Sequence, residues 1–157
     1  MDFYEVIDNA EIISMAFRIF SLMILLIAAA MDIREKKILI SIPAAQMFLS
    51  LIYFLYLFIK GMEKPGDLIL SMMPGLMLLT VAYMSKKGIG LGDGLMVLSL
   101  GPLFGMEDML LAVLISFTLS AIVGAVLLIL KKVNGKSTMA FIPFLTVGVG
   151  VMSFAVI

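Results

Sequence analysis

Residues 109–130 read MLLAVLISFTLSAIVGAVLLIL and contain no charged side chain. A run of this length matches the ~20 apolar residues that an α-helix needs to cross the hydrocarbon core of a bilayer. The whole chain has the same character, with 63% hydrophobic residues, 14% charged residues and a mean hydropathy of +1.21. Soluble domains average about 45–50% apolar and about 25% charged residues. The sequence therefore predicts an integral membrane protein whose outer surface faces lipid.

Six apolar stretches of similar length divide the chain. Each is close to the length of a membrane-spanning helix, and short polar segments such as residues 61–67 separate them. We therefore predict a single integral membrane domain over residues 1–157, an all-α polytopic bundle of six transmembrane helices. The expected helices cover residues 12–30, 39–59, 68–84, 89–106, 109–130 and 139–157.

Basic residues gather on one side of this alternating topology. Eight of the eleven lie in segments that would share a side, and cytoplasmic loops are enriched in lysine and arginine. We therefore predict a multi-pass protein of the plasma membrane with both termini outside the cytoplasm. Arg18, inside the first apolar stretch, is expected to extend its charged end toward the outer surface. The eight residues on the predicted cytoplasmic side are Arg34, Lys36, Lys37, Lys86, Lys87, Lys131, Lys132 and Lys136.

The chain contains no cysteine and no histidine. Thiolate nucleophiles, cysteine zinc sites, an HExxH zinc site and a Ser-His-Asp triad are therefore excluded. The lysines occur in short pairs and form no basic face, so no nucleic-acid partner is expected. Neither a metal nor another cofactor is indicated. Any catalysis must depend on carboxylates, lysines, hydroxyls or backbone groups.

Two aspartates lie at the predicted cytoplasmic ends of apolar stretches. Asp32 ends the first stretch, in AAAMDIREKK, and Asp93 lies about one helical turn inside the fourth, in KKGIGLGDGLM. Because a carboxylate in hydrocarbon is unfavourable, such residues usually face protein or water. Two carboxylates that share a site hold one proton between them, so that one acts as a base on water while the other donates a proton to an amide carbonyl. The pair therefore predicts aspartic-protease chemistry.

Glycines surround the second aspartate. Gly90 and Gly92 leave one face of the segment without side chains, so the backbone of a neighbouring helix or of an extended substrate can approach. A plainer interpretation is that the glycine-rich stretch only packs against another helix or caps its own. Asp32 would then pair only with a neighbouring basic residue. The predicted topology brings both aspartates to one membrane face, which favours the catalytic interpretation.

Three motifs together resemble one protein family. Gly90-Leu91-Gly92-Asp93 resembles the GxGD motif of aspartyl membrane proteases, and Asp32 before basic residues resembles the partner aspartate of the prepilin peptidases, or type IV leader peptidases. Ile142-Pro143-Phe144-Leu145 resembles the segment that opens the last helix of that family. The resemblance implies a membrane endopeptidase that removes the short basic leader of type IV prepilins, preflagellins or pseudopilins near the cytoplasmic face.

The resemblance also implies roles for single residues. Asp32 and Asp93 would be the catalytic pair. Gly90, Gly92 and Pro143 would shape the substrate-binding site. The expected partners are a prepilin or pseudopilin precursor peptide and the lipid bilayer. Because the chain resembles the short members, which lack the cysteine-containing insert of the methylating members, we expect peptidase activity without methylation and without a cofactor.

Three other interpretations stay open at this point. A multi-pass ion or proton transporter would use the same two aspartates to bind a cation or relay protons. A structural membrane subunit of a secretion or pilus complex would need neither carboxylate. A presenilin-like protease shares the GxGD motif but pairs it with a Tyr-Asp motif, whereas this chain has Met31-Asp32.

Overall fold

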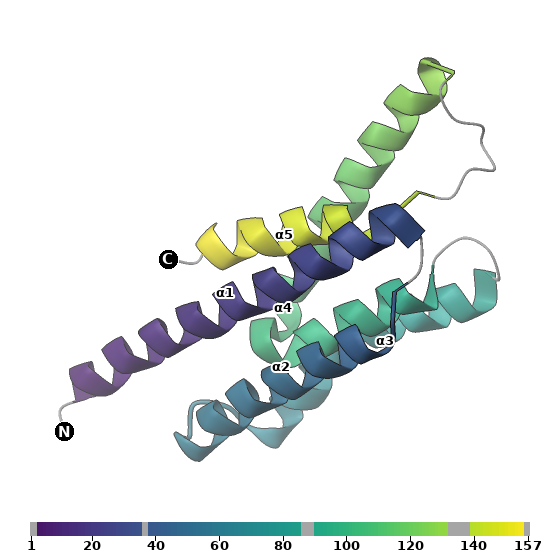
Figure 1. The fold of residues 1–157 in the computed structure, drawn as a ribbon. Helices are drawn as coiled ribbons and strands as arrows, with labels where there is room; N and C mark the ends of the chain where they lie inside the picture. Colours follow the sequence, from purple (N-terminus) through teal and green to yellow (C-terminus); the bar gives the residue numbers. More distant parts are fainter. Residues whose placement is uncertain (1–2, 36–37, 86–89, 132–138, 156–157) are drawn as a thin grey trace.

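The computed structural model describes residues 3–35, 38–85, 90–131 and 139–155 (Figure 1). Within these ranges the backbone forms five helices and no strand, so the predicted all-α class is confirmed. The helices are α1 (Phe3–Glu35), α2 (Ser41–Ile59), α3 (Pro65–Ser85), α4 (Leu91–Ile129) and α5 (Ile142–Ala155).

Four of the described helices contain a segment that is long and apolar enough to cross a membrane. Many large apolar side chains on these helices point outward, for example Leu26 at 60% and Met77 at 63% exposure. So much exposed apolar surface is unfavourable in water and typical of a surface that faces lipid. The helices therefore fit a membrane protein. The four segments are Glu11–Glu35, Ser41–Ile59, Pro65–Met84 and Leu91–Ile129, and α5 is a shorter apolar helix.

Helix α4 is interrupted at Gly105. The φ of 78° and ψ of 176° at this residue lie outside helical geometry, in a region open almost only to glycine. Pro102, three residues earlier, removes a backbone donor from the preceding turn and so weakens it. Figure 1 shows the chain turning back between the teal and the green parts of α4. The break lies close to the predicted boundary between the helices of residues 89–106 and 109–130.

Helices α3 and α4 pack backbone against backbone. A Cβ atom added to Gly75 would overlap the backbone of Leu98, and one added to Gly101 would overlap the carbonyl oxygen of Ser71. Only glycine permits so close an approach, as is common between membrane helices. This contact fixes the first part of α4, which carries Asp93, against α3.

The core lies where α1, α4 and α5 meet. Leu25, Met96 and Leu145, one from each of these helices, are fully buried. The end of α1, the starts of α2, α4 and α5 and the ends of α3 and α4 all lie at one end of the bundle (Figure 1). The segments that carry the predicted site residues therefore come together at this end.

Candidate active site

Asp32 lies in the last turn of α1, and its side chain is 6% exposed. Its Oδ2 atom accepts a hydrogen bond from the backbone N–H of Ile142, at 3.1 Å. Ile142 is the first residue of α5, and the N-terminus of a helix carries free N–H groups and a partial positive charge. The carboxylate of Asp32 therefore lies where the backbone of another helix stabilises negative charge. Arg34 is exposed and makes no ion pair with it in the described part of the chain.

The first turn of α5 presents a single N–H group to the aspartate of α1. Pro143 has no N–H, and the N–H groups of Phe144 and Leu145 both donate to the carbonyl oxygen of Phe141, at 3.0 and 3.1 Å. The N–H of Ile142 is then the remaining donor of this turn, and the aspartate accepts its hydrogen bond. A buried N–H group without a partner would cost about 1–3 kcal/mol, so this contact stabilises the junction of the two helices.

Asp93 is the third residue of α4 and is half-buried. Its Oδ2 accepts a hydrogen bond from the N–H of Gly90 at 3.3 Å, while its own N–H donates to the carbonyl oxygen of Gly90 at 3.1 Å. Gly90 has extended backbone angles and is the N-cap of the helix. The helix begins at Leu91, two residues later than predicted, so Asp93 lies in the first turn and not a full turn inside.

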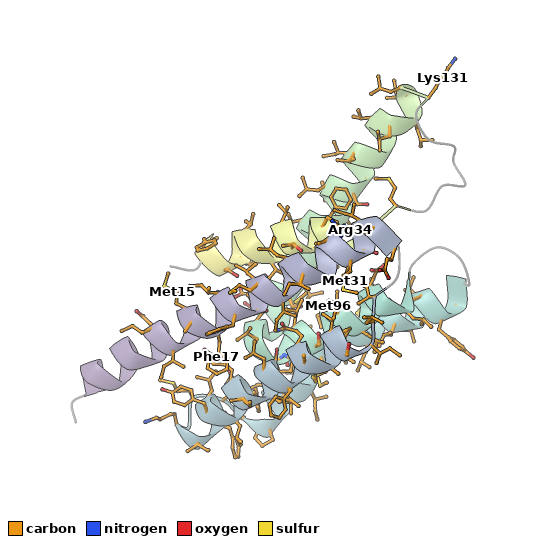
Figure 2. All side chains as sticks on the ribbon, viewed as in Figure 1. Met15, Phe17, Met31, Arg34, Met96 and Lys131 are labelled. Atoms are coloured by element: carbon orange, nitrogen blue, oxygen red, sulfur yellow. The ribbon has the colours of Figure 1, made fainter. Side chains whose placement is uncertain are left out.

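The two carboxylates approach each other from different helices. Ile38, which follows α1, lies against the start of α4, because a Cβ atom on Gly92 would be 3.1 Å from its Cδ1 atom. Asp32 and Asp93 are close enough for their charges to interact. Figure 2 shows Met31 and Arg34, which lie within two residues of Asp32 in the sequence, near the end of α1.

This arrangement determines which chemistry the site can perform. Within the ranges that the structure describes, no group of three His, Cys, Asp or Glu side chains is placed to hold a metal ion. Two carboxylates whose charges interact, one buried and one half-buried, are the chemically reactive groups that this end of the described bundle brings together, and carboxylates can serve as acid or base. Gly90 is exposed, and a Cβ atom there would lie 3.1 Å from Oδ2 of Asp93, so any side chain at this position would crowd the carboxylate.

The opposite end of the bundle contains a polar contact that the sequence interpretation missed. The side chain of Arg18, predicted to extend toward the outer surface, is 16% exposed and reaches the part of α4 that follows the turn at Gly105. It lies 3.5 Å from Asp108, donates to the carbonyl oxygen of Met152 at 3.2 Å and covers the ring of Phe104 at 5.2 Å. The contact joins α1, α4 and α5 because a guanidinium in an apolar helix needs partners. A cavity of about 400 Å³ beside it includes neither Asp32 nor Asp93.

The helices and the two neighbouring carboxylates define an all-α protein of membrane type with an acidic site at one end. A sequence model described as the type IV leader peptidase family matches residues 19–125, which is more than half of the chain and includes both aspartates. The chain therefore belongs to the type IV leader peptidase family and is a protease of that type, as the motifs predicted. Among curated proteins and among solved structures, none matches the chain.

Proposed function

We propose that Asp32 and Asp93 are the catalytic pair of an aspartic endopeptidase. The observation that carries this proposal is that both aspartates fall within the family match and their carboxylates lie within electrostatic range in the structure. The pair holds one proton and activates a water molecule for attack on a peptide carbonyl. Because the two groups titrate as a unit, neither is assigned separately as the acid or the base.

The proposed substrate is the junction between a short basic leader and an apolar helix in a prepilin-like, pseudopilin-like or preflagellin-like precursor. The scissile bond is extended when it lies between the two carboxylates, because a helical amide is closed to attack. Gly90, Gly92 and Pro143 border the two aspartates and are proposed to shape the path of this extended segment. Cleavage by this pair needs neither a metal nor another cofactor.

We also propose that the chain crosses the plasma membrane six times, with both termini outside and the aspartates near the cytoplasmic face. The turn at Gly105 supports two crossings within α4, whose 39 residues would otherwise form a rod of about 58 Å, nearly twice the ~30 Å hydrocarbon thickness. In the sequence, eight of the eleven lysine and arginine residues fall in the segments predicted to be cytoplasmic, which supports this orientation. The family match gives no support to the transporter alternative.

Cleavage of a reconstituted precursor tests the proposal. The protein is placed in lipid with a prepilin-like precursor from the same genome, and loss of the leader is followed on a gel. Wild type is expected to cut, whereas Asp32→Asn and Asp93→Asn are expected to lose at least about 1,000-fold in rate, because neither variant can share a proton as the pair does. Glu35→Gln is the matched control, because Glu35 is an exposed carboxylate in the last turn of α1, three residues after Asp32.

Two outcomes would contradict the assignment. Normal cutting by either asparagine variant would remove that aspartate from the catalytic pair. Absence of cutting by wild type on several leader-bearing precursors would contradict the proposed substrate class.

A further inference from the structure

We infer that the first turn of α5 is a positioning element for Asp32, in which the backbone N–H of Ile142 holds the carboxylate in the orientation that reaction requires. The inference rests on the proposed catalytic role of Asp32. It concerns a backbone group outside the residues 19–125 of the family match.

The contact is buried on both sides. Ile142 is fully buried, Asp32 is 6% exposed, and the N–H donates to Oδ2 at 3.1 Å. With water excluded, a charge-assisted hydrogen bond of this kind is stronger than one at the surface and restrains the side chain. The bond also joins residues that are 110 positions apart, so it depends on how α5 docks and not on the local sequence.

The donor is fixed in space because α5 is packed firmly against two helices. A Cβ atom on Gly148 would overlap the carbonyl oxygen of Ala112, so α5 lies backbone to backbone with the second part of α4. The hydroxyl of Thr146 lies 2.9 Å from the carbonyl oxygen of Ile142 on its own helix and 3.4 Å from that of Leu25, so this residue contacts α1. The contacts of α5 with α1 and α4 therefore fix the position of the N–H of Ile142. The hydrogen bond from this N–H in turn restrains the carboxylate of Asp32.

Just before α5, an aromatic contact adds to this restraint. The rings of Phe141 and Phe117 lie 4.9 Å apart, and Phe141 is the residue whose carbonyl oxygen accepts the other two N–H groups of the first turn. Pro143 supplies no N–H that could compete for the carboxylate. The turn therefore offers Asp32 a single donor in a defined position.

A positioning role has a kinetic signature. Ile142 is fully buried and its N–H is occupied by Asp32, so loss of this N–H should slow the chemical step and leave substrate binding intact. We expect kcat to fall about 10–100-fold with KM within about 2-fold of wild type, as for loss of one hydrogen bond to a charged group. A purely structural role would lower the amount of folded protein without changing kcat per folded molecule.

The sharpest test replaces the amide of residue 142 by an ester, which removes the N–H and keeps the isoleucine side chain. The matched control is the same replacement at Val149, an equally buried residue two turns along α5. Leader removal is then measured as kcat and KM per folded molecule, with folding checked by thermal unfolding in detergent. The inference predicts the loss of kcat for the ester at 142 and not for the ester at 149.

A second variant gives the same comparison by ordinary mutagenesis. Ile142→Pro removes the N–H at the first helical position, where proline fits. Ile142→Val is its control, because it also loses side-chain volume but keeps the N–H. The proline variant should have a kcat about 10–100-fold below that of the valine variant.

The outcomes separate this inference from the proposed function. If Asp32→Asn and Asp93→Asn are inactive but the 142 ester and Ile142→Pro keep the kcat of their controls, the positioning role is wrong and the catalytic pair stands. A change confined to KM would also overturn the positioning role. If wild type cuts no precursor, or if Asp32→Asn cuts normally, the proposed function itself fails.

Discussion

At the scale of single residues, the two aspartates have different structural surroundings. Asp32 is buried and accepts a hydrogen bond from another helix, whereas Asp93 is half-buried and caps the helix to which it belongs. The first contact is tertiary and the second is local. Replacing Asp32 should therefore disturb the docking of α5, in addition to any effect on catalysis.

This difference predicts that Asp32→Ala and Asp32→Asn separate structure from chemistry. Alanine leaves the N–H of Ile142 buried without a partner, which should lower the free energy of unfolding by about 1–3 kcal/mol. The amide oxygen of asparagine can still accept that hydrogen bond, so the asparagine variant should lose less stability. Denaturant unfolding in detergent measures both, and equal stability of the two variants would show that the contact contributes nothing to folding.

The residue scale also shows where sequence interpretation reached its limit. Asp32 and Asp93 were identified because charge in an apolar stretch is unfavourable and needs a reason. The N–H of Ile142 had no such signal, since a backbone donor is the same in every residue and its partner is 110 positions away. For Arg18 the sequence predicted a charged end directed toward the outer surface, but it gave no partner. The partners, Asp108 and the carbonyl oxygen of Met152, come from helices whose packing no single stretch reveals.

At the scale of helices, glycine decides how closely α3 and α4 approach. We predict that Gly101→Ala lowers stability by about 1–3 kcal/mol or more, because its Cβ would overlap the carbonyl oxygen of Ser71 and force the helices apart. Gly66→Ala is the control, since a Cβ there meets nothing within 4 Å, and it should be neutral or slightly stabilising. Thermal unfolding of the two variants in detergent gives the comparison.

The same pair of variants tests whether the close contact of α3 with α4 at Gly101 determines the position of Asp93. Separation of α3 from α4 should move Asp93 relative to Asp32, so Gly101→Ala should also reduce cleavage per folded molecule. Wild-type stability of Gly101→Ala would mean that the helices do not approach as closely as the structure describes.

The helical regions were predictable from the sequence, whereas the number of helices and their ends were not. Six helices were predicted and the described residues form five, because the predicted helices of residues 89–106 and 109–130 are joined in α4. The apolar runs fix which residues are helical because unpaired backbone groups are too costly in lipid. Helix α1 nevertheless extends from Phe3 to Glu35, beyond the predicted residues 12–30 on both sides, because polar residues continue a helix as well as apolar ones do. The turn at Gly105 was approximately located, since polar residues follow it, but its backbone angles depend on tertiary packing.

At the scale of the whole molecule, the bundle has a polar contact near each of its two ends. One end carries Asp32 and Asp93, and the other carries the contact of Arg18 with Asp108. The first lies where α1 meets α5 and the start of α4, and the second lies where α4 turns back. Packed glycines and the buried core join the two ends into one bundle. Which end faces the cytoplasm decides which substrates can reach the aspartates.

The absence of cysteine from the sequence makes that orientation measurable. The segment between α2 and α3 and the end of α4 lie at opposite ends of the bundle (Figure 1). The cysteine substitutions replace one exposed residue in each, Lys64 between α2 and α3 and Lys131 directly after α4. We predict that Lys64→Cys reacts with a membrane-impermeant thiol reagent in intact cells. Lys131→Cys should react only after the membrane is opened, because lysine-rich segments remain in the cytoplasm. The cysteine-free wild type gives the background.

The pattern of labelling has consequences for the substrate. The predicted pattern places the aspartates on the cytoplasmic side of the membrane. The basic leader of the precursor remains on that side until it is cleaved from the apolar helix. The reverse pattern would place them outside, where such a leader would first have to cross the membrane against the same charge preference that orients the enzyme. Labelling at both positions in intact cells would contradict a single orientation, and with it the proposal that all copies cleave from one face.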